Sequence, residues 1–297
     1  TASAEYQSKT AGLVDGIGTE DEILGKIREL VTYLPSNCED TDSYMECTDD
    51  LNRVCEDIEN CTGDTAIALS RIADNGQFFE VKADYGKSVA VGFIRLNGAT
   101  VGAVANRSEC YDAEGKKVWE SDGTLSARGA RKAAEFVKFC DAFEIPVLTL
   151  TNVNGFKATV CGEKMMAKSV GALVHAFADA TVPKVNVVIG KAFGTAYTAM
   201  NSKAIGADMV YAWENAEIGM MDADLAAKIM YAGDDAAALT EKAAEYRELQ
   251  NSVSSAAARG YVDTIISPAD TRKYVIGAFE MLFTKREERP SKKHGTV

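Results

Sequence analysis

Two glycine-containing segments are the places in this sequence where the main chain itself could do chemistry. Gly155-Phe156 follows the apolar run Val147–Val153, and Gly194-Thr195-Ala196 follows the apolar run Val185–Ile189 directly before a helical pattern. The N–H groups at the start of a helix have no partner within it and carry partial positive charge. They can therefore hold an oxyanion without any titrating side chain. The alternative interpretation is that both segments are ordinary strand-to-helix turns.

Catalysis by the common side-chain arrangements is disfavoured. Only two histidines are present, His175 within a helical pattern and His294 near the end in a basic tail. We expect a structural role for His175, and neither histidine is placed as the base of a Ser-His-Asp or Cys-His site. The phosphate-binding patterns GxxxxGK[ST] and GxGxxG are also absent between a strand and a helix.

The seven cysteines favour reduced thiols. Their number is odd and the chain is far larger than disulfide-stapled modules, which indicates a cytoplasmic location. Cys38, Cys47, Cys55 and Cys61 do cluster, but they form no CxxC pair and have no histidine nearby. A zinc site is the alternative, and the wide spacing favours ordinary thiols.

Composition excludes other classes of function. The 297 residues are 46% hydrophobic, which is enough for one large domain or two small ones with a real core. A net charge of −12 predicts repulsion from nucleic acid and from anionic membrane surfaces. No apolar run approaches the roughly 20 residues that span a bilayer. The first ten residues also lack the pattern of a signal peptide.

The negative charge is concentrated in one segment. From Pro35 to Asp64 there are ten acidic residues and one basic residue, Arg53. The segment follows an amphipathic helix that we expect at Glu20–Leu34, with Thr19 as the signal for its start. We expect a solvated linker, with a docking surface for a basic partner as the alternative.

The remaining elements indicate an α/β layered fold. A hairpin is expected from Val89–Leu96 and Thr100–Ala105, which flank Asn97-Gly98, a strong turn signal. After Ser126, helical patterns alternate with continuous apolar runs, as in strands covered on both faces. The expected elements are helices at Thr65–Ile72, around Ala133–Cys140, around Met166–Phe177, at about Thr195–Ile205, at Asp235–Arg259 and at Asp270–Phe283, with strands at Val147–Val153, Val185–Ile189, Met209–Trp213 and Glu217–Met221.

Several segments in this order resemble one known family. They are YLPSN, NGQFFEVKADYGKSVAVGFIRLNGATVGAVANR, KAAEFVKFCDAFEIPVLTL, FADATVPKVNVVIGKAFGTAY, SKAIGADMVYAWENAEIGMM and RGYVDTIISPADTRKYV. The sequence resembles the C-terminal half of the carboxyltransferase β subunits of biotin-dependent acyl-CoA carboxylases and decarboxylases, of the propionyl-CoA carboxylase type. The resemblance runs from about Leu24 to Lys293.

The resemblance implies a crotonase-like fold built from ββα units. It implies a single C-terminal-type domain over residues 1–297, with 1–64 as a helical, acidic extension and 65–297 as the core with C-terminal helices. In the family a second domain of the N-terminal type holds most of the acyl-CoA. The implied partners are therefore a subunit of that type, a separate biotin carboxyl carrier protein and an oligomeric assembly. The sequence has no AMKM-like tetrapeptide, since Lys164 lacks the flanking pattern, so biotin is expected on another protein.

The resemblance also assigns the site. The family's biotin-side oxyanion hole matches the backbone N–H groups of Thr195 and Ala196. The residues implied to bind biotin or substrate are Gly155, Phe156, Phe193, Gly194, Tyr197 and Thr198. The implied reaction moves a carboxyl group between carboxybiotin and the α carbon of a short acyl-CoA. The amides stabilise negative charge on the ureido group, and a second oxyanion hole in the other domain holds the enolate.

The sequence departs from the family pattern near this site. Thr195 stands where a second glycine is usual, and Thr198 stands where an acidic residue often influences the choice of acyl chain. Asn154 and Lys157-Ala158-Thr159 alter the segment around Gly155, and Asp222 replaces a common glycine. Two alternatives to a carboxylase subunit remain: a subunit of a sodium-pumping decarboxylase acting on glutaconyl- or methylmalonyl-CoA, and a non-catalytic scaffold.

Overall fold

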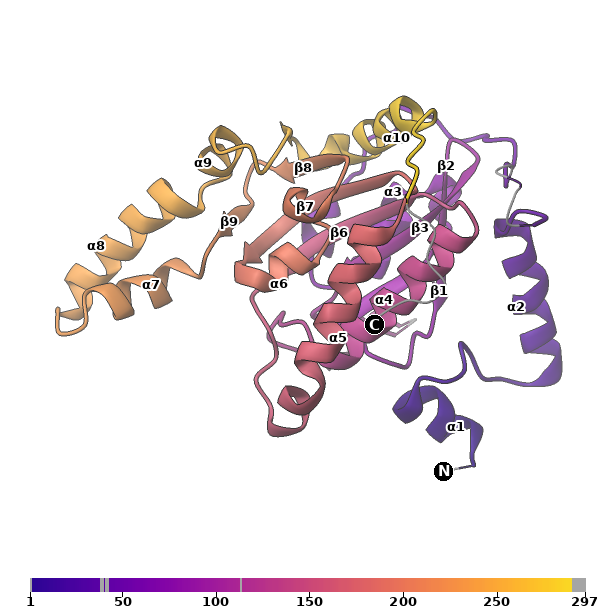
Figure 1. The fold of residues 1–297 in the computed structure, drawn as a ribbon, viewed down its shortest axis with the longest axis horizontal. Helices are drawn as coiled ribbons and strands as arrows, with labels where there is room; N and C mark the ends of the chain where they lie inside the picture. The colour runs from indigo at the N-terminus through magenta and orange to yellow at the C-terminus, as the bar shows by residue number, and fades with distance from the viewer. Residues whose placement is uncertain (1, 38–39, 41–42, 113, 290–297) are drawn as a thin grey trace.

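A mixed sheet forms the centre of the protein. The computed structural model describes residues 2–37, 40, 43–112 and 114–289. In these ranges the strands follow the order β1-β2-β3-β6-β7-β8-β10, with β9 added to the end of β7 (Figure 1). The sheet strands are β1 Phe79–Val81, β2 Val89–Leu96, β3 Ala99–Asn106, β6 Val147–Val153, β7 Lys184–Phe193, β8 Met209–Trp213, β9 Glu217–Gly219 and β10 Thr264–Ile266. Strands β4 (Glu109–Tyr111) and β5 (Lys117–Glu120) form a separate hairpin.

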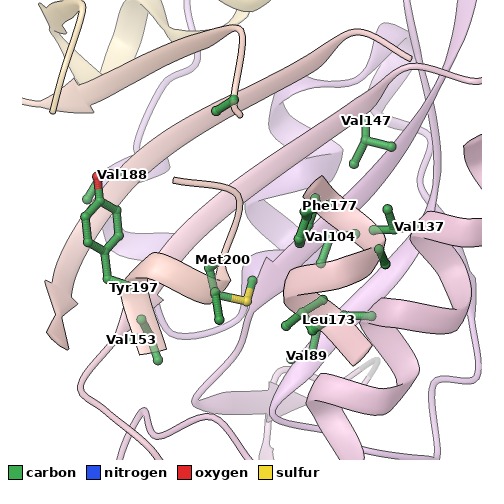
Figure 2. Packing of buried hydrophobic residues seen from close by; sticks show 14 of the residues in the cluster. Val89, Val104, Val137, Val147, Val153, Leu173, Phe177, Val188, Tyr197 and Met200 are labelled. Carbon is green, nitrogen blue, oxygen red and sulfur yellow. The ribbon is translucent and has the colours of Figure 1, made fainter. Parts of the chain in front are cut away.

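Helices cover both faces of the sheet. Packed residues of α4, α5 and α6 belong to one apolar cluster with the sheet, and those of α3 and α10 belong to a second. Figure 2 shows labelled side chains of the first cluster. The helices are α1 Ala4–Tyr6, α2 Glu20–Tyr33, α3 Thr65–Ile72, α4 Ala127–Ala142, α5 Val160–Asp179, α6 Gly194–Ala199, α7 Ala223–Met230, α8 Ala236–Tyr246, α9 Val253–Ala258 and α10 Thr271–Leu282. None of the helices in the described ranges combines the length and apolar character needed to cross a membrane.

The continuous apolar runs are buried strands, as the sequence predicts. Val147 and Val153 of β6 lie in the first cluster, whereas Leu148 and Leu150 lie in the second. Successive side chains of a strand point to opposite faces, so a strand covered on both sides needs apolar residues at every position. The parallel order β3-β6-β7-β8 is produced by helical crossovers between these strands.

The predicted hairpin is also confirmed. Strands β2 and β3 pair antiparallel along their full length, from Val89 opposite Asn106 to Leu96 opposite Ala99. The two turn residues have positive φ, 51° at Asn97 and 79° at Gly98, as a type I′ turn requires.

Two helical predictions need correction. The helix expected at Thr195–Ile205 ends at Ala199, and a separate 3₁₀ turn covers Lys203–Ile205. The chain breaks between them because Asn201 adopts φ 51°. The pattern Asp235–Arg259 is split at Ser252 (φ −62°, ψ 143°), whose side chain accepts a hydrogen bond from the N–H of Ser255 and begins α9. The sequence analysis also missed α1, α7, β1, β10 and the β4–β5 hairpin.

The N-terminal segments are attached to the core more closely than a solvated linker would be. The start of α2 is confirmed: the Thr19 and Glu22 side chains form a capping box. In the acidic segment after α2, Cys55 and Ile58 are fully buried in the described residues. The expectation of a solvated linker is therefore wrong for this part, because apolar residues spaced between the acids pack under the sheet.

One buried ion pair connects α10 to the segment after α3, between residues 198 positions apart in the sequence. Arg272 of α10 is fully buried, and its guanidinium donates to the Asp74 carboxylate at 2.6 Å and to the carbonyl oxygens of Asp50 and Ile72. Asp74 also accepts from the N–H groups of the hairpin turn at Asn97 and Gly98. These bonds hold α10, the acidic segment, the end of α3 and the hairpin together.

We expect Arg272→Met to lower the free energy of unfolding by about 3–5 kcal/mol, because Asp74 would become a buried carboxylate without a counter-ion. The matched control is Arg131→Met, which breaks an exposed pair with Glu135 and should cost less than about 1 kcal/mol. Urea denaturation followed by circular dichroism measures both losses. Equal losses in the two variants would contradict this role of Arg272.

Candidate functional site

The two glycine segments lie side by side. Strands β6 and β7 are parallel neighbours, and Val153 at the end of β6 pairs with Ala192 near the end of β7. Gly155-Phe156 and Gly194-Thr195-Ala196 therefore leave the sheet at the same edge. The carboxyl edge of parallel strands is where ligands commonly bind in α/β proteins.

The segment after β7 is a helix start with no side-chain cap. Phe193 is extended (φ −114°, ψ 136°), Gly194 has φ 61°, and no side chain accepts from the first turn of α6. Thr195 is exposed, whereas the side chain of Ala196 is buried. The amides of Thr195 and Ala196 are first-turn groups without partners inside the helix. A side chain at Gly194 would press on the carbonyl oxygen of Met220, 3.1 Å from an added Cβ, so close approach of the main chain favours glycine here.

The segment after β6 is held by main-chain hydrogen bonds. The N–H of Leu125 donates to the Gly155 oxygen at 2.8 Å, and the N–H of Lys157 donates to the Leu125 oxygen at 3.0 Å. The Asn154 side chain donates to the carbonyl oxygen of Asp122 at 2.7 Å. Asn154 is a departure from the family pattern, and its hydrogen bond connects this segment to the loop before α4.

A buried polar network lies beneath α6. The Thr151 hydroxyl of β6 donates to the Asn186 side-chain oxygen of β7 at 2.8 Å, and the Asn186 amide donates to the Met200 carbonyl oxygen at 3.3 Å. The Asn201 amide donates to the Thr149 hydroxyl at 3.2 Å. Thr149, Thr151, Asn186 and Asn201 are all fully buried. These hydrogen bonds connect the residues at the end of α6 to β6 and β7, and so determine where the helix lies relative to the two strands.

The remaining predicted residues differ in exposure. The side chains of Phe193 and Tyr197 are buried, and the Thr198 hydroxyl lies 3.5 Å from the Gly194 oxygen one turn earlier. The Tyr197 hydroxyl has no hydrogen-bond partner among the described residues, and burial raises the pKa of Tyr197 to about 12. The first-turn amides of α6, which have no partners inside the helix, are therefore better candidate donors than these side chains.

Two contacts near α6 were missed by the sequence analysis. The Lys191 ammonium of β7 pairs with Asp222 at 3.3 Å, and Asp222 also accepts from the N–H of Asp224 at the start of α7. Asn251 is fully buried and donates to the Met221 carbonyl oxygen at 2.9 Å. Asp222, another departure from the family pattern, therefore positions the loop that passes Gly194. Nothing in the spacing of these residues along the chain indicates the contacts.

The other sequence candidates form no site within the described ranges. Cys47, Cys55 and Cys61 are free thiols, and no group of metal-binding side chains is found there. His175 is partly buried on α5, and its Nδ1 has no described partner. Cys38 and His294 lie outside the described residues.

Residues 3–297 match the family model of the carboxyl transferase domain. The chain belongs to the carboxyl transferase family. It is 38% identical to the propionyl-CoA carboxylase beta chain of Roseobacter denitrificans, over 99% of this chain and 58% of that protein. It is 36% identical to the methylmalonyl-CoA decarboxylase subunit alpha of Propionigenium modestum, again over 99% of this chain and 58% of that protein.

Solved structures of the carboxyl transferase family confirm the crotonase-like fold. A crystal structure of transcarboxylase 12S, described as a hexamer with hydrolysed methylmalonyl-coenzyme A bound, superposes with a TM-score of 0.89 at 37% identity. The match covers 99% of this chain and 57% of that one. The chain therefore spans little more than half the length of the relatives it matches.

We expect Thr151→Val, which keeps the shape and removes the hydroxyl, to lower the free energy of unfolding by about 1–3 kcal/mol. It should also speed hydrogen exchange at the amides of α6, because the Asn186 oxygen loses its donor. Thr151→Ser retains the hydroxyl and should leave that exchange unchanged. If both variants leave the exchange at the wild-type rate, the network does not hold α6.

Proposed function

We propose that this chain is the C-terminal-type domain of a biotin-dependent carboxyltransferase, moving a carboxyl group between carboxybiotin and the α carbon of a short acyl-CoA. The observation that carries the proposal is the uncapped start of α6 beside Gly155-Phe156, in a chain of the carboxyl transferase family. Biotin fits such a place because its ureido oxygen needs hydrogen-bond donors and no titrating side chain.

The Thr195 and Ala196 amides are proposed to donate to the ureido oxygen. Bound biotin supplies the transferable carboxyl group and a nitrogen that exchanges a proton with the α carbon. The two amides stabilise the negative charge that develops on the ureido group, and they need no reorganisation because α6 is held from below. Gly155, Phe156, Gly194 and Thr198 are proposed to border the site, with Phe193 and Tyr197 supporting it from the core.

A domain of the N-terminal type is proposed to complete the site, with a biotin carboxyl carrier protein and acyl-CoA as the other partners. The proposal of an N-terminal-type domain is supported by coverage, because this chain spans only 58% of the length of each of the relatives from Roseobacter denitrificans and Propionigenium modestum. Assembly into an oligomer is proposed as well. Leu225, Ile229 and Met230 expose apolar side chains on α7, which projects with α8 from the body (Figure 1).

A decarboxylase subunit is the second candidate, favoured by the relative from Propionigenium modestum. The same transfer step would run in reverse, so the site described above serves either direction. A non-catalytic scaffold is less well supported, because Asn154 and Asp222 have structural roles at the site rather than blocking it.

We expect the purified chain to be inactive alone and to gain carboxyl transfer when an N-terminal-type domain is added. The physical reason is that only one of the two oxyanion holes is proposed to lie in this chain. Decarboxylation of malonyl- or methylmalonyl-CoA with free biotin measures this. Robust turnover by the chain alone would show that no second domain is needed.

In the reconstituted complex, we expect Ala196→Pro to lower turnover by about 100-fold or more, because it removes one N–H donor. Proline is tolerated in the first turn of a helix, so the fold should survive, as circular dichroism can verify. Thr195→Gly is the control: it keeps its N–H and should keep near-normal turnover. A folded Ala196→Pro complex with normal turnover would refute the oxyanion assignment, and an inactive unmutated complex would favour the scaffold.

A further inference from the structure

A basic cavity lies beside the start of α4. Its volume is about 280 Å³, and its walls carry four cationic side chains, Lys9, Lys87, Arg128 and Lys157. Asp84 is the single carboxylate among the lining residues. This concentration of positive charge contrasts with the net charge of −12 on the whole chain.

Three of the four cations are not neutralised by ion pairs. The Lys9 ammonium is held by Glu5 at 2.8 Å. Lys87, Arg128 and Lys157 form no ion pair with a carboxylate in the described part of the chain. The pKa of Asp122 is lowered mainly by a hydrogen bond from the Thr124 hydroxyl, and the charge of Lys157 contributes less to this lowering. A bound anion would be stabilised by the positive charge of these three side chains.

The segments that carry these cations are fixed independently. The buried Lys132 ammonium donates to the carbonyl oxygens of Tyr85 and Val89 at 3.0 and 2.9 Å, which holds the loop containing Lys87. Gly86, with φ 53°, brings that loop against the Arg128 carbonyl, which would lie 3.1 Å from an added Cβ. The main-chain bonds of Leu125 described above hold the segment containing Lys157. Because these segments are fixed, binding does not have to order the main chain that carries the cations.

The cavity also offers hydroxyl and aromatic groups. The Ser121 hydroxyl lines it, and this buried oxygen has no hydrogen-bond partner in the described ranges. Ser88 and Ser126 line it too, bonded to each other at 2.7 Å. The partly exposed Trp119 adds an indole ring, a surface on which a purine can stack. Cations, hydroxyl donors and an aromatic ring are the groups that recognise phosphorylated nucleotides.

We propose that this cavity binds a phosphate group. Phosphate binding by these residues, which lie outside the start of α6, does not depend on carboxyl transfer, whereas coenzyme A as the source of the phosphate rests on the proposed function. Lys157 lies two residues beyond Gly155, so a ligand that reaches the proposed transfer site could place a phosphate here. Two sources share this chemistry: the 3′-phosphate of coenzyme A, and free inorganic phosphate.

Binding to the full chain tests the proposal, with coenzyme A, dephospho-coenzyme A and inorganic phosphate as separate probes. We expect saturable binding, measured by calorimetry and by Trp119 fluorescence. The double variant Arg128→Gln/Lys157→Gln should weaken it about 10-fold or more. The matched control is Lys168→Gln/Lys228→Gln, which removes the same charge from exposed positions on α5 and α7 and should change the affinity less than about 2-fold.

The outcomes separate the two sources. Tighter binding of coenzyme A than of dephospho-coenzyme A, lost in the Arg128/Lys157 variant, assigns the cavity to the 3′-phosphate. Equal loss of binding for all probes, inorganic phosphate included, assigns it to a free phosphate. The proposal is overturned if no probe binds saturably, or if both double variants change the affinity equally. Because no turnover is measured, failure here leaves the carboxyl transfer proposal to its own experiments.

Discussion

The parallel pairing of β6 with β7 is the constraint on which the proposed site depends. It brings two segments almost 40 residues apart in the sequence to one edge of the sheet. The Thr151–Asn186 contact then fixes α6 against both strands from within the core. Buried polar groups of this kind are costly when unpaired, so the network specifies one arrangement of the helix rather than adding much net stability.

Chemistry based on main-chain amides tolerates changes in side chains. Thr195 keeps its N–H although it replaces a glycine of the family pattern, and its side chain is exposed rather than directed into the core. Asn154 donates to the Asp122 carbonyl oxygen in a neighbouring loop, and Asp222 pairs with Lys191 of β7. These departures from the family pattern are therefore compatible with an intact site, because none of them removes an N–H group that is proposed as a donor.

Charge is distributed unevenly in the fold, and the distribution has consequences. Much of the acidic excess lies in the segment after α2, where Arg53 and Arg272 neutralise part of it. The basic cavity beside α4 lies elsewhere, and four cations line its volume of about 280 Å³. Net charge predicts poor binding to extended polyanions, whereas a local cluster can still bind a single phosphate because screening limits the range of the distant acids.

The sequence by itself determined the α/β class, the buried strands, the β2–β3 hairpin and the family. These depend on local patterns: apolar runs, Asn97-Gly98 and the order of motifs. Only the tertiary structure decided where α6 ends, because the Asn201 side chain just after the helix donates a hydrogen bond to Thr149 of β6. The same holds for the Lys191–Asp222 pair and for the basic cavity, whose four cations come from four separate segments. Contacts between residues distant along the chain leave no periodic signal, so no local pattern could predict them.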